Sequence, residues 1–301
     1  MMRPNRLMYM TSSSGFTLLE VLTSMFLTSV VMTLIISSVM MLRDTYYTEI
    51  KRTQINGNLR SAMDIMSMNV RQAGEHLLAG FPAVLLTDGA SGASDTLRLR
   101  KSPITEVLTL CADAAVGTTG LFVSSASLSN AECIPTNVDP IHTAFTTALA
   151  AEENKQIYVY DKSQKIGEFL NYTSSDTSSG QYMLIVEATS TAFTKLNTSI
   201  YIIEEYQFSN NEAESRLDLT INQESTEIRP VAFDVTNFQV TFLLQDGTSV
   251  SAFAQDGTKD WKDIHQIEMT LSGRASFKGQ TLRSTITSKF FPRNVLSYEG
   301  G

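Results

Sequence analysis

A run of apolar residues near the N-terminus, Phe16–Leu42, constrains this chain more than any other feature. Its twenty-seven residues carry a single charge, at Glu20. A helix of about 20 apolar residues spans the hydrocarbon core of a bilayer. The Ser and Thr residues in the run do not oppose this reading, because their hydroxyls can bond back to helix carbonyls. The run therefore predicts a membrane-spanning helix.

The residues on either side of the run indicate its orientation. Arg3 and Arg6 precede it without any acid, so the N-terminus is expected in the cytoplasm and everything after Arg43 across the membrane. A cleaved secretory signal has a shorter apolar region with a small-residue cleavage site after it. Here the small residue Gly15 comes before the run, and the polar stretch RDTYYTEIKR follows it. These features disfavour an ordinary signal peptide.

Glu20 is the one carboxylate of the run and needs an explanation. A charge in a membrane helix costs about 2.5–3.5 kcal/mol on insertion scales, so it requires a partner or a proton. A cut after Gly15 would place a new α-amine on Phe16, about one helical turn away. The alternative is an acid solvated at the headgroup level, with the membrane starting later in the sequence.

The residues around Glu20 resemble the class III leader motif of type IV pilins and type II secretion pseudopilins. That motif has a Gly, a Phe that becomes methylated, a Thr, two or three apolar residues and a Glu at the fifth mature position. Gly15, Phe16 and Glu20 match it within SSSGFTLLEVLTSM. The resemblance implies that a prepilin peptidase cuts between Gly15 and Phe16 and methylates the Phe16 amine. It also implies that Glu20 pairs with the Phe16 amine of a neighbouring subunit in a filament.

The helical pattern continues beyond the apolar run. Apolar residues recur three and four positions apart, which is typical of a helix packed by one face; they are Leu59, Met63, Met66, Val70, Ala73 and Leu77. Gly57 interrupts this pattern only weakly, at a cost of up to about 1 kcal/mol relative to alanine. We predict one helix from about Phe16 to Leu78, ended by Gly80 and Pro82. Its second part should pack on the chain's own globular domain.

After the helix, the pattern changes to the alternating, β-branched and aromatic runs of strands. Strands are expected in TLRLRK at 96–101, QIYVYD around Tyr158, QYMLIVE around Leu184, SIYIIEEYQF around Ile203, RLDLTI around Leu219, FQVTFLLQDGT at 238–248, HQIEMTLSG from His265 and TLRSTITSKFF at 281–291. The strand from His265 should return antiparallel to the one at 238–248. Residues 87–95 and 173–180 have the composition of loops. The predicted fold is α+β, a long N-terminal helix packed on a mainly antiparallel β-sheet domain.

Four regions follow from these patterns. They are a leader peptide at 1–15, a transmembrane or filament-core helix at 16–42, its amphipathic continuation at 43–79 and a periplasmic β-rich domain at 80–301. Both ends of the chain resemble minor pilins of the PilW type, in NVRQAGEHL, ASDTLRLR, VTNFQVTFLLQDG and the closing FFPRNV. The middle of the chain, about residues 102–154, resembles no family pattern that we identify.

The PilW-type resemblance implies a minor pilin, incorporated at or near the tip of a type IV pilus and promoting pilus assembly. The implied partners are the prepilin peptidase, the other minor pilins and the major pilin. The inner membrane would hold the chain, by a single pass, before it reaches the pilus at the cell surface. Two alternatives remain: a J-type minor pseudopilin of type II secretion, and a pilus-tip adhesin or receptor.

Charge and cysteine content bear on other functions. The net charge of −8 disfavours binding to nucleic-acid phosphates. The sequence holds no catalytic motif that we identify, so neither enzymatic activity nor a cofactor or metal is expected. Cys111 and Cys133 would lie on the oxidising side of the membrane, where a disulfide between them is expected; two buried thiols are the alternative.

Overall fold

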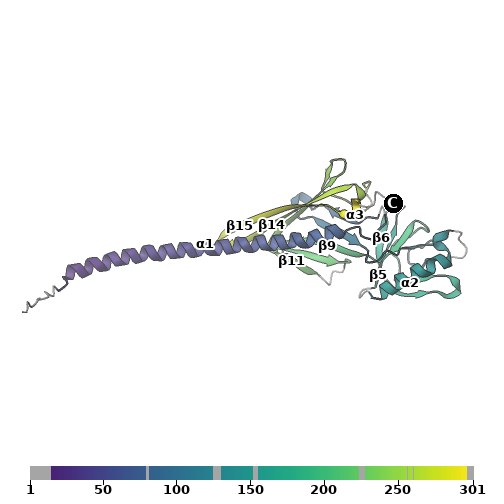
Figure 1. Cartoon of the computed structure of the whole chain (residues 1–301), viewed down its shortest axis with the longest axis horizontal. Coiled ribbons are helices and arrows are strands. Elements are labelled where there is room, and N and C mark those ends of the chain that lie inside the picture. Colours follow the sequence, from purple (N-terminus) through teal and green to yellow (C-terminus); the bar gives the residue numbers. More distant parts are fainter. Residues whose placement is uncertain are drawn as a thin grey trace, which may run out of the picture. The chain divides into compact units, whose positions relative to one another are not determined.

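A computed structural model of the chain describes residues 15–78, 81–124, 130–151, 155–223, 228–255, 257–259 and 261–296. The chain divides into two compact units, Met1–Lys51 and Arg52–Gly301. The helix α1, Leu18–Gln72, begins in the first unit and ends in the second. The second unit contains antiparallel sheets packed on the last turns of α1, so the predicted α+β class is confirmed (Figure 1).

The helix ends six residues earlier than predicted. It stops at Gln72, and Gly74 follows in a left-handed conformation with a φ of 85°. The backbone N–H of Gly74 donates to the carbonyl of Arg100 at 2.9 Å, and a Cβ on Gly74 would lie 2.8 Å from the Trp261 ring. The helix therefore ends where the chain meets a strand and a tryptophan from distant parts of the sequence. Gly80, predicted to end the helix, lies outside the described residues.

A five-stranded sheet forms one layer of the second unit. Its order is β1-β2-β9-β10-β11, and every neighbouring pair is antiparallel. The bounds are β1 Val84–Thr87, β2 Thr96–Lys101, β9 Glu204–Asn211, β10 Arg216–Ile221 and β11 Arg229–Phe233. The alternation at 96–101 correctly located β2, which buries Leu97 and Leu99.

A four-stranded antiparallel sheet forms a second layer, in the order β13-β12-β14-β15. The bounds are β12 Val235–Leu244, β13 Ser249–Val250, β14 Ile264–Phe277 and β15 Gln280–Phe290. The pairing of β12 with β14 is antiparallel, as the turn signal between them predicted. A short helix, α3 Arg293–Leu296, ends the described chain.

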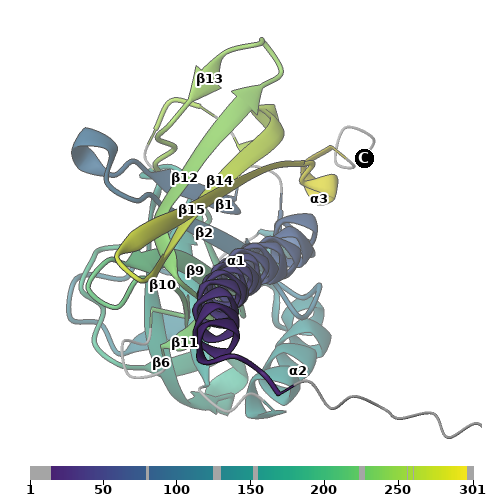
Figure 2. The same ribbon diagram turned by 90° about the vertical axis from the view of Figure 1, so that its left-hand side faces the viewer.

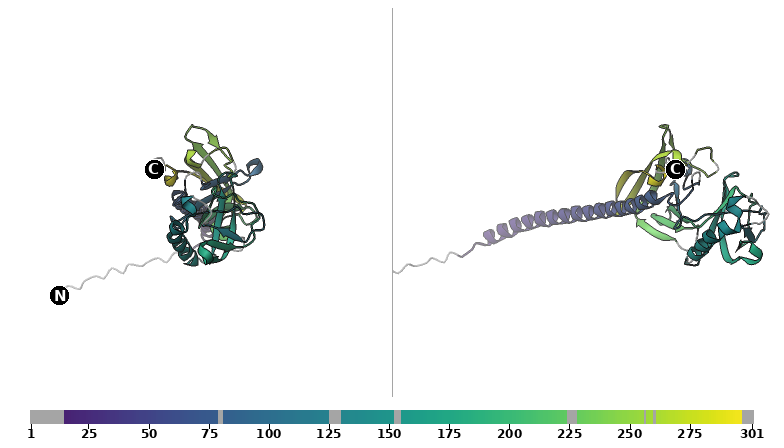
Figure 3. Two further views of the ribbon diagram at one scale, coloured as in Figure 1. Left: turned by 90° about the vertical axis from the view of Figure 1, so that its right-hand side faces the viewer. Right: turned by 45° about the vertical axis from the view of Figure 1, so that its right-hand side comes forward.

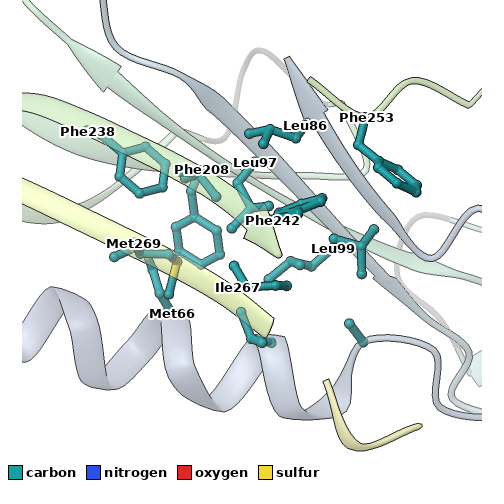
Figure 4. Close-up of a cluster of buried hydrophobic side chains, with 14 of the residues drawn as sticks. Met66, Leu86, Leu97, Leu99, Phe208, Phe238, Phe242, Phe253, Ile267 and Met269 are labelled. Atoms are coloured by element: carbon teal, nitrogen blue, oxygen red, sulfur yellow. The ribbon is translucent and has the colours of Figure 1, made fainter. Parts of the chain in front are cut away.

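The main hydrophobic core lies between the last turns of α1 and these two sheets. Figure 2 shows strands of both sheets beside the same helix. All six residues of the predicted helical stripe are buried in this core. Figure 4 shows Met66 of α1 among Phe208, Phe242, Ile267 and Met269, which come from β9, β12 and β14. The amphipathic pattern after the apolar run therefore packs on the chain's own sheets, as predicted.

A third sheet lies in a lobe inserted between β2 and β9, which we call the inserted lobe and define as residues 102–203. Its six strands have the order β3-β8-β5-β6-β7-β4. The bounds are β3 Leu108–Thr109, β4 Gly120–Phe122, β5 Gln156–Asp161, β6 Ile166–Asp176, β7 Met183–Val186 and β8 Thr198–Tyr201. Figure 3 shows this teal lobe separate from the yellow-green strands of the four-stranded sheet.

Two sequence predictions within this region were wrong. The stretch 173–180 was expected to be a loop, but its first part, up to Asp176, belongs to β6. This part is a strand because it pairs with β7, where Asp176 is the partner of Met183. The run around Ile203 was expected to be one strand, but it forms β8 and β9, which belong to different sheets. The chain crosses from the inserted lobe to the five-stranded sheet between Tyr201 and Glu204.

The inserted lobe has a hydrophobic core of its own. The helix α2, Pro135–Ala151, contributes Val138, Phe145 and Leu149 to it, and β5 contributes Ile157 and Val159. The backbone N–H of Cys111, just after β3, donates to the carbonyl of Phe122 in β4 at 2.7 Å. Because β3 and β4 are the two edges of the six-stranded sheet, this contact shows that the sheet curls towards closure.

Asp161 fixes the turn that follows β5. Its Oδ1 accepts from the backbone N–H of Ser163 at 2.8 Å, and its Oδ2 accepts from the N–H of Thr194 at 3.0 Å. Burial alone raises the pKa of this carboxyl, but the hydrogen bonds from Ser163 and Thr194 outweigh burial and hold the pKa well below its usual range. Asp161 is thus a charged group that the fold stabilises in its ionised form.

Strand β5 joins the two cores, because its side chains alternate between them. Tyr158 and Tyr160 face the main core, where the ring of Phe81 lies 5.7 Å from Tyr158 and 5.3 Å from Tyr160. The guanidinium of Arg100 lies over Tyr158 and forms a buried ion pair with Glu205 at 2.6 Å. Removing one partner of such a pair costs about 3–5 kcal/mol. The pair itself joins β2 to β9, whereas the contacts of Phe81 and Arg100 with Tyr158 and Tyr160 hold the inserted lobe to the main core.

Gly273 of β14 lies directly under α1 and gives a test of that packing. A Cβ at this position would lie 2.8 Å from Ile55 Cγ2 and 2.9 Å from the carbonyl oxygen of Asp234. We expect Gly273→Ala to lower the free energy of unfolding by about 1–3 kcal/mol, because it overpacks the helix–sheet contact. Urea unfolding of the detergent-solubilised chain measures this change.

The matched control is Gly57→Ala, on the exposed face of the same helix. No atom of the described residues lies within 4 Å of the methyl group that this change adds. This change should raise stability by up to about 1 kcal/mol. A Gly273→Ala chain as stable as the unchanged protein would show that α1 does not press on β14.

Candidate functional site

The residues of the N-terminal motif form the start of α1. Gly15, Phe16 and Thr17 precede the helix, which begins at Leu18. Thr17 Oγ1 accepts from the backbone N–H of Glu20 at 3.3 Å, and Glu20 Oε2 accepts from the N–H of Thr17 at 3.4 Å. This reciprocal pair is a capping box, which satisfies two N–H groups that the first helical turn leaves without partners.

The capping box is a role for Glu20 that the sequence interpretation missed. The signal was present, because Thr17 and Glu20 have the Thr-x-x-Glu spacing that starts helices. The contacts described for the Glu20 carboxylate use Oε2 alone. A carboxylate offers about four lone-pair sites, so this one retains capacity to accept from a second group.

The bond between Gly15 and Phe16 lies outside the helix and away from packed structure. Among the described residues, no atom lies within 4 Å of the place where a Cβ on Gly15 would stand, and Phe16 is 82% exposed. A peptidase must bind the bond that it cuts within its own cleft, so that bond has to be exposed. The Gly15–Phe16 bond is exposed in this way. Gly15, Phe16 and Glu20 therefore occur together at one end of the helix.

The part of α1 from Leu18 to Leu42 presents apolar side chains on all sides. Its large hydrophobic residues are exposed all round the helix, with Met41 at 74% and Leu19 at 73%. Its hydroxyls bond back to the helix: Thr28 Oγ1 donates to the Ser24 carbonyl at 2.7 Å and Ser37 Oγ to the Thr33 carbonyl at 2.8 Å. The surface of this part is therefore suited to apolar surroundings rather than to water.

By length and hydropathy α1 also qualifies as a membrane-spanning helix. Among the described residues it is the one helix that does so. Its most apolar stretch has a mean hydropathy of 2.2, and none of that stretch is buried. Residues 1–14, including Arg3 and Arg6, lie outside the described residues.

Cys111 and Cys133 form a disulfide bond in the structure, with their Cα atoms 5.8 Å apart. Cys111 follows β3, and Cys133 ends a short 3₁₀ helix, Ala131–Cys133. Both are buried beside the core of the inserted lobe. The bridge is far in sequence from the N-terminal motif and stabilises the lobe rather than taking part in processing.

The histidines lie in separate settings. His142 of α2 is buried against the ring of Tyr182, with centroids 4.9 Å apart, and burial lowers its pKa. His265 lies in β14, and His76 Nδ1 lies 3.1 Å from the carbonyl oxygen of Ser102. Within the part of the chain that the structure describes, no three His, Cys, Asp or Glu side chains group as metal ligands would.

Comparison with known proteins bears on the N-terminal motif. Residues 10–36 match the family model described as the prokaryotic N-terminal methylation motif, and Gly15, Phe16 and Glu20 all lie within the match. No curated protein matches the chain. The chain thus carries a prokaryotic methylation motif at the place where the leader motif was identified.

A solved structure that is similar to this chain is a type IV-like pilin from Thermus thermophilus. It is 9% identical, with a TM-score of 0.34, and the alignment covers 80% of this chain and 98% of that one.

The disulfide yields a prediction about stability. Replacing Cys111 and Cys133 together by serine should lower the free energy of unfolding by about 3 kcal/mol, because the bridge closes a loop in the unfolded chain. Their separation in sequence is 22 residues. Urea unfolding of the two chains gives this difference.

Alkylation gives an independent check on the same bridge. In denaturant, a maleimide should label neither cysteine until a reductant is added, and both afterwards. Labelling of either cysteine without reductant, in protein recovered from its native compartment, would contradict the bridge.

Proposed function

We propose that the chain is a membrane-anchored prepilin, cut between Gly15 and Phe16 by a prepilin peptidase and methylated on the new Phe16 amine. The observation that carries the proposal is the methylation motif at residues 10–36, placed on an exposed Gly15–Phe16 bond just before an apolar helix. Residues 16–42 would anchor the chain in the inner membrane. Residues 80–301 would then lie in the periplasm.

In this proposal the mature chain is a minor pilin of the PilW type, a structural subunit at or near the tip of a type IV pilus. The two parts of α1 support a role in assembly. Its first part exposes apolar side chains all round, whereas its continuation buries Leu59, Met63 and Met66 on the chain's own sheets. A helix of this kind can leave the bilayer for a filament core at little cost, because both surroundings are apolar. The partners would be other minor pilins and the major pilin.

Glu20 would serve both the chain itself and its neighbour. Within the chain it completes the capping box with Thr17 through Oε2. The methylated Phe16 amine of a neighbouring subunit would supply the positive charge that a carboxylate needs in apolar surroundings. The contact would fix the axial register between the two subunits.

Processing provides the first test of the proposal. Gly15→Val should leave the precursor uncut in the inner membrane, because a branched side chain does not fit where the motif has glycine. Gly15→Ala, which adds one methyl group, is the matched control and should be cut more than the valine variant. Mass spectrometry of the unchanged protein should find N-methyl-phenylalanine at Phe16, whereas a mature N-terminus beyond Leu42 would exclude the proposal.

Glu20 provides the second test, with two variants that separate its roles. Glutamine at N3 retains the capping box but has no charge, whereas alanine loses both. If charge pairing drives assembly, Glu20→Gln and Glu20→Ala should both be cut after Gly15, yet both should reduce surface pili and recovery of the minor-pilin complex. Electron microscopy and co-purification measure these effects.

The remaining outcomes of the Glu20 experiment are also informative. Normal assembly with Glu20→Gln and loss with Glu20→Ala would assign the effect to the helix cap. Normal assembly with both variants would exclude Glu20 as the contact. Normal piliation with failed protein secretion in a strain lacking the chain would indicate a J-type pseudopilin instead.

A further inference from the structure

A groove on the inserted lobe runs beside the edge of its six-stranded sheet. Its volume is about 440 Å³, within the range of about 300–1,000 Å³ that is typical of ligand-binding clefts. One wall is a continuous stretch of chain, Thr105–Thr109, which contains β3. The facing residues are Glu132, Val138 and Ile141, with Leu78 also contributing.

The strand β3 in this wall lies at the edge of the sheet. Some of its backbone groups point away from the sheet, towards the groove. β3 pairs with β8 alone in the order of the sheet. The N–H of Leu110 donates to the Thr198 carbonyl at 2.9 Å, towards β8. Successive residues of an antiparallel strand alternate in the side to which they bond. The N–H group of Thr109, the neighbour of Leu110 in β3, therefore faces away from β8.

Cys111 shows that this outer side can take a strand partner. Its N–H faces the same way as that of Thr109, and it donates to the carbonyl of Phe122 in β4 at 2.7 Å. β4 thus occupies the outer side at Cys111. The positions at Val107 and Thr109 line the groove instead.

The side chains of the groove add an apolar surface and a negative charge. Leu78 is 45% exposed and Ile141 38%, while Val107 is half-buried. Glu106 and Glu132 are the charged residues of the lining, and no Lys or Arg is among its described residues. The lobe around it is acidic, since residues 102–203 contain ten Asp or Glu and four Lys.

We propose that this groove binds an extended segment of a partner protein, which adds to β3 as a further strand. A backbone carbonyl of the segment would accept from the N–H group of Thr109, as in strand addition to other exposed sheet edges. An apolar side chain would pack on Leu78 and Ile141. A Lys or Arg of the segment would lie between Glu106 and Glu132, which gives the groove its preference for basic segments.

The test uses the full mature chain in detergent and a displayed library of short random peptides. Selection should enrich peptides that combine alternating apolar residues with Lys or Arg. The variant carrying Glu106→Lys and Glu132→Lys should instead enrich peptides with Asp or Glu, because the charge at the rim is reversed. A cooperative urea-unfolding transition close to the midpoint of the unchanged chain confirms that each variant is folded.

A second variant tests the backbone contact. Thr109→Pro removes the outward N–H without touching the bonds to β8, and proline is tolerated at such edge positions. It should weaken binding of the selected peptides about threefold to tenfold relative to Thr109→Ala, which keeps the N–H.

Three results would overturn the proposal. They are a failure to enrich any peptide, selection of the same charges by the reversed rim, and equal binding to Thr109→Pro and Thr109→Ala. None of these results bears on cleavage after Gly15, so the inference and the proposed function fail independently.

Discussion

The packing of one helical stripe, from Ile55 to Val70, on two sheets is the contact on which the rest of the second unit depends. Each large apolar side chain in it contributes about 1.5–3 kcal/mol by leaving water. Both the five-stranded and the four-stranded sheet bury side chains against it. Gly273 permits the close approach, since any side chain there would collide with Ile55. The stripe therefore fixes where both sheets lie.

The same helix meets two different requirements along its length. Before Leu42 its side chains are exposed on all sides and its hydroxyls bond to its own carbonyls. After Ile55 only one face is apolar and buried. A single regular element thus connects a segment suited to apolar surroundings with a folded unit that needs water on its outer face. The capping box at Thr17 and Glu20 starts this helix from within the chain.

The sequence predicted those parts of the fold whose signals are local. The helical stripe, β2 and the pairing of β12 with β14 follow from periodicity and turn residues within short windows. The end of α1 did not, because it depends on Gly74 meeting Arg100 and Trp261, which are distant in sequence. The boundary between β8 and β9 falls in the continuous apolar pair Ile202 and Ile203, where no local residue marks it.

The candidate site likewise contains residues that local sequence signals identified and contacts that only the tertiary fold creates. Gly15, Phe16 and Glu20 were found from a motif, whereas the cap contact of Thr17 was overlooked although its spacing is local. The groove beside β3 was beyond prediction, because it joins Leu78, Thr105–Thr109 and α2 only through the tertiary fold. The segment that resembled no known pattern proved to contain α2 and the start of the lobe.

The place where the inserted lobe joins the five-stranded sheet has a mechanical consequence. The chain leaves this sheet at Lys101 and returns at Glu204, and these two residues are direct partners in the antiparallel pair. Tension applied through the lobe pulls β2 and β9 in the same direction, so their mutual hydrogen bonds carry none of it. The force passes instead to the ladders β1–β2 and β9–β10, which it loads in shear. All bonds of a sheared ladder resist together, so the lobe is attached in the geometry that best withstands pulling.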